Sequence, residues 1–244
     1  MIQFLRKLLP VSSKKIFRKK LNLRRISISQ AGQDFWVYGE AFNEKENGYF
    51  VDIGAFDGLH ISNSYLLETD YNWSGICIEA NPKQFHDLKK NRNVTCLNVC
   101  LDQQEGEVEF IQRHVMSGII DDDLDNTASD DLKGEVISIH TTTLRKVLKE
   151  NNAPKVIDYL SIDVEGAEER ILSEFDFNEY KFRSITIERP SDKLRSIFED
   201  NDYCLIKEIP GLDCFYIHRD FLDQYHSNLF QFYHKKYLRL PRSR

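Results

Sequence analysis

Short apolar runs and segments with helical spacing alternate along the chain from Gly48 onward. Apolar runs of this length indicate strands, and apolar residues three to four positions apart indicate amphipathic helices. Such alternation favours an α/β domain in which a mostly parallel sheet carries helices on both faces. The predicted helices lie at 59–69, at 82–91 and directly after Val164. The predicted strands lie at 49–53, 74–80, 94–101, 106–111, 158–164, 182–188, 203–209 and 213–218.

The connections and the two ends of the chain complete this organisation. Only the segment "PGL" separates the last two predicted strands, which should therefore form an antiparallel hairpin. The stretch 117–135 contains seven acids and one lysine, and it is expected to be a mobile loop or lid. The sequence divides into a basic segment at 1–28, a main domain at 29–220 and a basic, aromatic tail at 221–244.

Charge is distributed unevenly over the 244 residues, whose net charge is −6. Residues 1–25 contain nine Lys or Arg and no acid, whereas the remainder holds 24 basic and 39 acidic residues. Because attraction to phosphate supplies most non-specific affinity for nucleic acid, the acidic remainder argues against a nucleic-acid partner. The basic segment is either a solvated tail or an amphipathic helix that contacts an anionic membrane.

The cysteines and the hydropathy indicate a compartment. The chain has five cysteines, an odd number, and none shows the close C-x-x-C spacing of a zinc or redox site. They are expected to be reduced thiols, as is usual in a cytoplasmic protein. No apolar run approaches the roughly 18 residues of a membrane span. The expected location is therefore the cytoplasm, with peripheral membrane contact if the basic segment binds lipid.

The stretch "GYFVDIGAFDGLHISNSYLLE" places two acids and two glycines in a turn behind an apolar strand. Gly54 allows a tight turn and a close approach to a ligand, and Gly58 allows close passage into the next helix. The pattern is D-x-G-x-x-x-G rather than the dinucleotide fingerprint G-x-G-x-x-G. A pyrophosphate needs amide donors at such a turn, whereas Asp52 and Asp57 favour a cationic or hydroxyl-bearing ligand.

Further acids follow the later strands, at the edge where a parallel sheet binds its ligands. Glu79 ends the second strand, 25 residues after Gly54, and can accept hydrogen bonds from both hydroxyls of a ribose. A nucleoside ligand with a positive charge and no pyrophosphate describes S-adenosylmethionine. Asp102 could then meet the adenine edge, and Asp163 would lie close to the methyl group.

Four segments together resemble the FkbM-type methyltransferases: "GYFVDIGAFDGLHISNSYLLE", "GICIEANPKQF", "DQQEGEVEF" and "IDYLSIDVEGAEERIL". The resemblance covers residues 29 to about 218. It implies the seven-stranded class I methyltransferase fold, with S-adenosylmethionine as the cofactor. It also implies an acceptor hydroxyl on a sugar, a glycan or a related small molecule. The resemblance and the acids at the strand ends together give these candidate cofactor residues: Gln33, Asp34, Asp52, Gly54, Phe56, Asp57, Gly58, Ser62, Asn63, Glu79, Ala80, Asp102 and Asp163. Among these, Ser62 and Asn63 could reach the methionine carboxylate, and Gln33 and Asp34 could cover the site.

A hydroxyl is a weak nucleophile, so a base within hydrogen-bond reach should assist its methylation. The candidate catalytic residues are Asp163, Glu165 and Glu188, with Asp163 as the first choice for the base and Glu188 as the second. His114 and His140 are alternatives, although His140 is better explained as structural. Asp163 and Glu188 could instead share a divalent metal, but no residue is assigned as a metal ligand.

Two other classes of protein compete with this hypothesis. One is another nucleotide-dependent α/β enzyme, such as a short-chain dehydrogenase. The missing dinucleotide fingerprint counts against it. The other is a methyltransferase-like module that binds without catalysis, which loss of the glycine turn or of the ribose acid would favour. Both features are present here.

Overall fold

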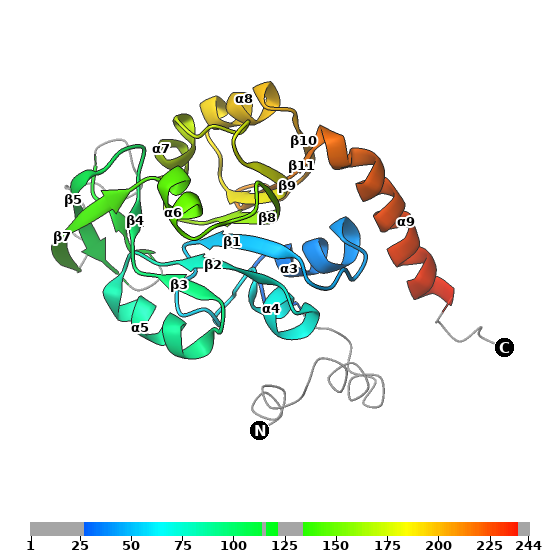
Figure 1. Cartoon of the computed structure of the whole chain (residues 1–244), viewed down its shortest axis with the longest axis horizontal. Helices are drawn as coiled ribbons and strands as arrows, with labels where there is room; N and C mark the ends of the chain where they lie inside the picture. Colours follow the sequence, from blue (N-terminus) through cyan, green and yellow to red (C-terminus); the bar gives the residue numbers. More distant parts are fainter. Residues whose placement is uncertain (1–26, 114–115, 122–133, 239–244) are drawn as a thin grey trace.

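The computed structural model describes residues 27–113, 116–121 and 134–238. The proposed amphipathic segment at 1–25 and the candidate His114 lie outside the described residues. Seven strands of the described chain form the main sheet (Figure 1). In sheet order they are β10 (Tyr203–Glu208), β11 (Asp213–His218), β9 (Lys181–Glu188), β8 (Val156–Ile162), β1 (Tyr49–Ile53), β2 (Ser74–Ile78) and β3 (Thr95–Leu97).

The central strands are parallel and buried on both faces. β1 pairs in parallel with β2 and with β8, and the parallel pairing continues to β3 on one side and β9 on the other. Strands covered on both faces are apolar throughout, which explains their continuous apolar runs in the sequence. β11 is antiparallel to both β9 and β10, so the predicted C-terminal hairpin is confirmed.

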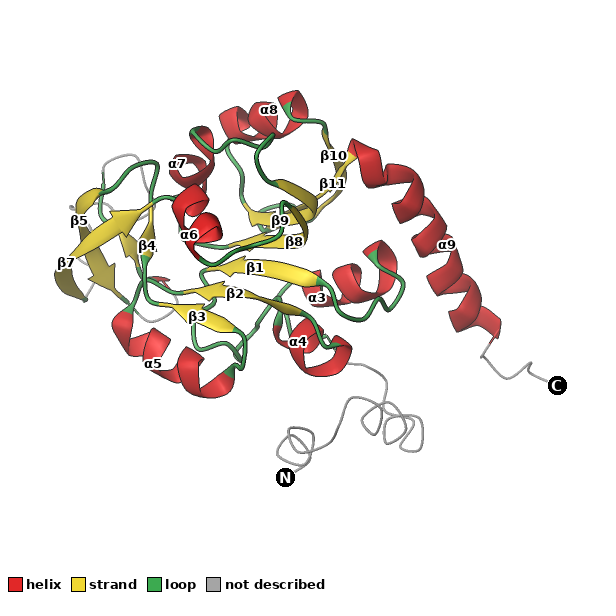
Figure 2. Ribbon diagram, in the orientation of Figure 1, coloured by secondary structure: helices red, strands yellow, loops and turns green. Residues whose placement is uncertain are grey.

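Helices cover both faces of this sheet (Figure 2). On one face, α6 (Leu144–Glu150), α7 (Glu168–Ser173) and α8 (Asp192–Asp200) bury Val147, Leu172 and Phe198 against the strands. On the other face, α4 (Tyr65–Tyr71) and α5 (Pro82–Asn91) bury Leu67 and Leu88. Each fully buried side chain of this size contributes about 1.5–3 kcal/mol to folding. The helices are α3 (Gln33–Phe35), the π-helical η1 (Trp36–Ala41), α4 (Tyr65–Tyr71), α5 (Pro82–Asn91), α6 (Leu144–Glu150), α7 (Glu168–Ser173), α8 (Asp192–Asp200), the 3₁₀ turn η3 (Arg219–Phe221) and α9 (Leu222–Leu238).

A second, four-stranded sheet lies beside the main one and corrects two predictions. Its order is β4 (Cys100–Leu101), β7 (Glu135–Thr142), β5 (Gly106–Gln112) and β6 (Gly118–Ile119). The predicted strand 94–101 is therefore divided between the two sheets as β3 and β4. The first part of the predicted acidic loop 117–135 is strand β6, because Ile119 is buried against Phe110. Residues 122–133 lie outside the described residues.

Two further segments differ from the sequence prediction. The predicted helix 59–69 begins only at Tyr65, because residues 59–64 form turns in which Ile61 has a φ of 43°. The predicted tail from 221 is instead the helix α9 over Leu222–Leu238. This helix is ordered by packing, because Tyr225 is buried in the aromatic cluster on that face and Phe232 packs against it. No described helix is both long and apolar enough to cross a membrane.

Candidate functional site

The candidate site lies where the direction of chain progression across the sheet reverses. From β1 the chain moves to β2 and β3 on one side, and later returns to β8 on the other side of β1. Ligands of open α/β sheets bind at this crevice, outside the carboxyl ends of the strands. A cavity of about 430 Å³ opens here.

Gly54 is required by the close approach of two strand ends at this crevice. Its φ is +81°, and a Cβ placed on it would lie 1.7 Å from the backbone oxygen of Asp163. The backbone N–H of Asp163 donates to the carbonyl of Ile53 at 3.0 Å, which holds the two turns together. Only glycine fits both the positive φ and the contact. The glycine of the D-x-G-x-x-x-G turn thus brings the loop after β1 against the loop after β8.

Ten of the residues singled out from the sequence line this cavity. They come from the last residues of β1 and β9 and from the loops after β1, β2 and β8, so one edge of the sheet gathers segments that are far apart in the sequence. They are Asp52, Gly54, Phe56, Ser62, Asn63, Glu79, Ala80, Asp163, Glu165 and Glu188. Gln33, Asp34, Asp57, Gly58 and Asp102 are not part of its lining.

Gln33 and Asp34 hold neighbouring segments instead of covering the cavity directly. The side-chain amide of Gln33 donates to Asp213 Oδ2 at 2.6 Å, and both side chains are buried. Asp34 accepts the backbone N–H of Ile28 at 2.9 Å, and its other oxygen accepts the Ser29 hydroxyl at 2.6 Å. Asp34 therefore fixes the segment that enters the domain. Gln30, next to this segment, does line the cavity.

Asp57 and Gly58 shape the loop after β1. Asp57 Oδ1 accepts the backbone N–H groups of Leu59 and His60 at 2.8 and 2.7 Å, which is an Asx-type turn. Gly58 has a φ of +74°, and a Cβ there would lie 2.7 Å from Cγ of Arg92. Both residues are therefore structural supports of the loop.

Asp102 is paired with an arginine and does not line the cavity, and the adenine contact suggested for it stays a prediction. Arg170 Nε donates to Oδ1 of Asp102 at 3.0 Å, and Nη2 donates to Oδ2 at 2.6 Å. Asp102 is only 3% exposed, so both oxygens of this buried carboxylate are engaged in a bidentate salt bridge with Arg170. The partner comes from α7, which the local sequence around Asp102 could not reveal.

Asp52 is the most buried acid at the end of β1, and Ser64 donates its hydroxyl proton to Oδ2 of Asp52. Burial raises the pKa of Asp52, and the nearby Arg92 opposes that rise. Beside it, Asn63 Nδ2 donates to Ser161 Oγ at 3.0 Å. Asn63 Oδ1 is buried and has no hydrogen-bond partner within the described part of the chain. An acceptor in this state suits a ligand that brings a donor.

Glu79 follows β2 and is almost entirely buried. Its Oε2 accepts the backbone N–H of Phe56 at 2.9 Å, and its Oε1 accepts that of Asn81 at 2.7 Å. Burial raises its pKa to about 7, although the two backbone hydrogen bonds oppose this. Each carboxylate oxygen keeps a second lone pair, so Glu79 can still accept from a ligand.

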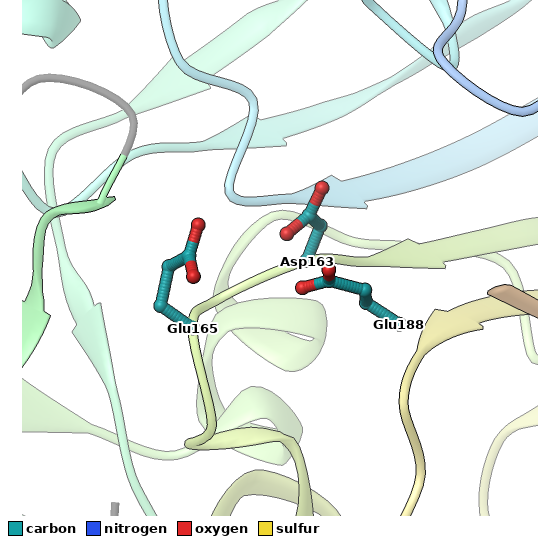
Figure 3. Close-up of side chains that lie close together, drawn as sticks. All are labelled: Asp163, Glu165 and Glu188. Atoms are coloured by element: carbon teal, nitrogen blue, oxygen red, sulfur yellow. The ribbon is translucent and has the colours of Figure 1, made fainter. Parts of the chain in front are cut away.

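Three acids converge at the other end of the cavity (Figure 3). Asp163, Glu165 and Glu188 each have a carboxylate oxygen within 4.8 Å of the others. Burial, together with the negative charges of Glu188 and Glu165, raises the pKa of Asp163 to about 8. At the rim, Arg189 Nε lies 3.2 Å from Oε1 of Glu188. This arrangement can accept hydroxyl protons, and three such oxygens could also hold a divalent cation.

An apolar wall of the cavity was not predicted. It consists of residues after β3 and from the second sheet, and its side chains include Val99, Cys100, Leu101, Phe110 and Ile119. Burial raises the pKa of Cys100 to about 12, so this thiol is neutral at physiological pH. The alternation of 106–111 indicated a strand, but nothing local showed that this strand folds over the ends of β2 and β3.

Unusual backbone conformations concentrate around the cavity. Phe56, Ile61, Glu165 and Arg189 all line it and have φ values of 50°, 43°, 57° and 36°. Such values are rare for residues other than glycine, and a β-branched Ile is a clear outlier. Strained residues of this kind persist where the surrounding structure holds them, which is common at binding sites. By contrast, the candidate His140 lies outside this cavity, and its side chain is 76% exposed.

The strand order identifies the class of this protein. Numbered by appearance in the main sheet, its strands run 6-7-5-4-1-2-3, with the seventh antiparallel to its neighbours. Together with a glycine turn and an acid after the first two strands, this is the class I methyltransferase fold, as predicted.

The comparisons with known proteins then identify the family. The profile named "Methyltransferase FkbM domain" matches residues 52–205, and the chain belongs to the FkbM methyltransferase family. The competing hypothesis of a short-chain dehydrogenase is therefore not retained. No protein with a curated description matches the sequence significantly.

Solved structures resemble this chain at low identity. A methyltransferase FkbM from Methylobacillus flagellatus KT is 15% identical, with a TM-score of 0.45, over 70% of this chain and 44% of that one. The chain thus matches less than half of that protein. A precorrin-6y C5,15-methyltransferase from Geobacter metallireducens GS-15 is 13% identical, with a TM-score of 0.43, over 79% and 91% of the two chains. The N-terminal domain of human METTL16 in complex with SAH is 12% identical, with a TM-score of 0.42, over 82% and 77%.

Proposed function

We propose that this protein uses S-adenosylmethionine to methylate a hydroxyl group of a sugar, a glycan or a related small molecule. The observation that carries the proposal is Asp163, a carboxyl group with a pKa of about 8 at the switch point of a methyltransferase fold. A group with a pKa near the working pH is suited to accept a proton from a hydroxyl. Its neighbours Glu165 and Glu188 can orient that hydroxyl.

The residues around the cavity fit the proposed cofactor. Glu79 can accept the two ribose hydroxyls, and the apolar wall that includes Phe110 and Ile119 offers contacts to the adenine ring. Asp52 and the unpaired Oδ1 of Asn63 can accept hydrogen bonds from the ammonium group of the methionine part. When bound, this cofactor supplies an electrophilic methyl group. The protein's own contribution is to hold the acceptor oxygen in line and to take its proton.

The charges at the acceptor end support a neutral, hydroxyl-rich acceptor. Asp163, Glu165 and Glu188 are partly balanced by Arg189 alone among the charged residues of the lining. Carboxylates accept hydrogen bonds from neighbouring hydroxyls, and they repel phosphate or carboxylate groups at short range. Incubation with labelled S-adenosylmethionine and separate glycan, glycolipid and anionic small-molecule fractions tests this proposal. Label appearing only in anionic small molecules would contradict it.

The first prediction concerns cofactor choice. S-adenosylmethionine and its product S-adenosylhomocysteine should bind and raise the unfolding temperature, whereas NAD should not. The reason is that Asp52 and Glu79 suit an ammonium group and a diol, whereas a pyrophosphate would be repelled. Calorimetric titration of the full chain with each ligand measures this directly. Binding of NAD without binding of either methionine derivative would reject the proposed function.

The second prediction concerns a peripheral membrane contact through residues 1–25, which would present the cavity to lipid-linked or envelope acceptors. The full chain should co-sediment with anionic vesicles and be released as salt rises, since each surface cation contributes up to about 1 kcal/mol of attraction. A chain beginning at Ser27 is the comparison, and neutral vesicles are the control. Equal sedimentation of the two chains would show that the basic segment is only a tail.

A further inference from the structure

Arg92 is a buried arginine that lies behind the cavity and takes no part in its lining. It caps the C-terminal end of α5, where its backbone N–H donates to the carbonyl of Leu88 at 3.0 Å. Its side chain is 0% exposed. Burying a charged guanidinium destabilises a protein unless its N–H groups form hydrogen bonds. The hydrogen-bond partners of Arg92 therefore explain how it can be buried.

Within the described part of the chain, the hydrogen-bond partners of the Arg92 side chain all lie on one short stretch, residues 58–68. Nε donates to Oε2 of Glu68 at 2.5 Å, and Nη2 donates to Oγ of Ser64 at 2.9 Å. Nη1 reaches the carbonyl of Gly58 and the hydroxyl of Ser62, each at 3.4 Å. The guanidinium therefore ties together the loop between β1 and α4. That loop supplies Ser62 and Asn63 to the cavity.

The same guanidinium is linked to the buried acid of the cavity through one hydroxyl. Ser64 accepts from Arg92 and donates to Asp52, so the three side chains form a continuous chain of hydrogen bonds. The positive charge of Arg92 opposes the effect of burial on the pKa of Asp52. The other titratable groups that face Asp52 are Cys77 on β2, Glu79 after β2 and Tyr159 on β8. None of these three is a cation, so Arg92 is the positive charge on Asp52 within the described residues.

We propose that Arg92 is a positioning residue for the cofactor: its fork holds the loop 58–64 in its binding conformation, and its charge faces Asp52 through Ser64. The inference rests on the proposed function, because it assigns Asp52 to the ammonium group of the methionine part. It extends that function, because the ionisation of Asp52, and with it the affinity for the ammonium group, then depends on a side chain outside the cavity. Protonation of Asp52 would remove the attraction for the ligand's ammonium group.

The test compares Arg92→Met, Arg92→Lys and Ser64→Ala by titration with S-adenosylhomocysteine between about pH 6 and pH 9. Arg92→Met removes the charge, so its Kd should exceed that of the wild type by about tenfold or more at the acidic end. The difference in Kd between Arg92→Met and the wild type should narrow as pH rises. Without the charge of Arg92 the pKa of Asp52 is higher, so Asp52 ionises in the variant only at higher pH. Arg92→Lys keeps the positive charge, so its Kd should vary with pH as that of the wild type does. Its loss of affinity should be smaller than that of Arg92→Met.

Several controls separate this role from a purely structural one. The ratio of variant Kd to wild-type Kd cancels the titration of Glu79, which faces the same cavity. Arg145→Met makes the same change at an exposed arginine on α6, paired with Glu179, and should leave Kd unchanged at every pH. Ser64→Ala removes the hydroxyl that joins Arg92 to Asp52 and leaves the hydrogen bond between Arg92 and Glu68, so it decides the question if Arg92→Met does not fold.

Two results would overturn the inference while leaving the proposed function standing. One is a ratio that does not vary with pH in Arg92→Met and Ser64→Ala. The other is unchanged affinity in both variants. If the wild type itself does not bind S-adenosylhomocysteine, the proposed function fails first, so the two failures are distinguishable. A lowered unfolding temperature with a flat ratio would identify Arg92 as a structural residue only.

Discussion

Asp163→Asn is expected to reduce methyl transfer by about 10²–10⁴-fold, the usual contribution of a general base. The amide keeps the size of the side chain and can still contact the acceptor, but it cannot take a proton. Affinity for S-adenosylmethionine should change by less than about threefold, because the ribose and the ammonium group are assigned to Glu79, Asp52 and Asn63, and an amide at 163 keeps the size of the side chain. Turnover and calorimetric affinity measured on the same preparation separate the two effects.

The pH dependence of the wild type gives an independent check on Asp163. Burial and the charges of Glu188 and Glu165 raise its pKa to about 8, so the carboxyl is largely protonated at lower pH. A base works only when it is unprotonated, so the rate should rise with pH and level off above about 8. In Asp163→Asn the small remaining rate should no longer rise with pH in this range.

The same substitution should make the protein more stable at alkaline pH. A carboxyl group whose pKa is higher in the folded state than in the unfolded chain binds protons more tightly when folded. Its contribution is therefore fully present below the unfolded value near 4 and is lost as pH rises through about 8. Asp163→Asn escapes this loss, so its Tm should exceed that of the wild type by about 5 °C or more above that pH. The gain should shrink towards acid.

Two controls distinguish a base from a metal site at this cluster. Glu188→Gln removes one member of the three acids and should lower the pH at which the wild-type rate levels off, because one negative charge facing Asp163 disappears. A chelator should have no effect if Asp163 acts as a base alone, whereas loss of activity that Mg²⁺ restores would favour a shared ion. Full activity of Asp163→Asn without metal would exclude both roles for this residue.

The cofactor half of the cavity was largely predictable because it depends on local pattern and one topological rule. The apolar runs before Asp52 and Glu79 marked the ends of two parallel strands, and parallel strands end at the same edge of a sheet. Gly54 was predictable for the same reason, since a turn after a strand that meets another loop needs glycine. The roles of these residues towards the cofactor stay predictions.

What could not be predicted depends on contacts between segments distant in the sequence. Asp102 and its partner Arg170 are 68 residues apart, and each alone resembles an ordinary polar residue. A single arginine after a helix, such as Arg92, is usually an exposed partner of the helix dipole, so its burial had no local signal. The segment 221–244 was predicted to be a tail, because its order depends on the distant aromatic face against which Tyr225 and Phe232 of α9 pack.

Glu79→Gln is expected to weaken binding of S-adenosylhomocysteine by about 10–100-fold, since ribose hydroxyls donate better to a carboxylate than to an amide. Gln keeps one acceptor for the backbone N–H groups of Phe56 and Asn81, whereas Ala would leave both unpaired. Wild-type affinity should rise with pH through about 7, where Glu79 ionises, and this step should be missing in the variant.

Asp102→Asn is the matched comparison, because it makes the same chemical change in another buried acid close to the same edge of the sheet. The structure pairs Asp102 with Arg170, so this variant should lower the Tm by weakening a charge-assisted, two-pronged interaction. Its affinity for S-adenosylhomocysteine should stay close to that of the wild type, because Asp102 does not line the cavity. The reverse pattern, with normal binding in Glu79→Gln and weak binding in Asp102→Asn, would show that the nucleoside lies beyond β3 rather than over Glu79.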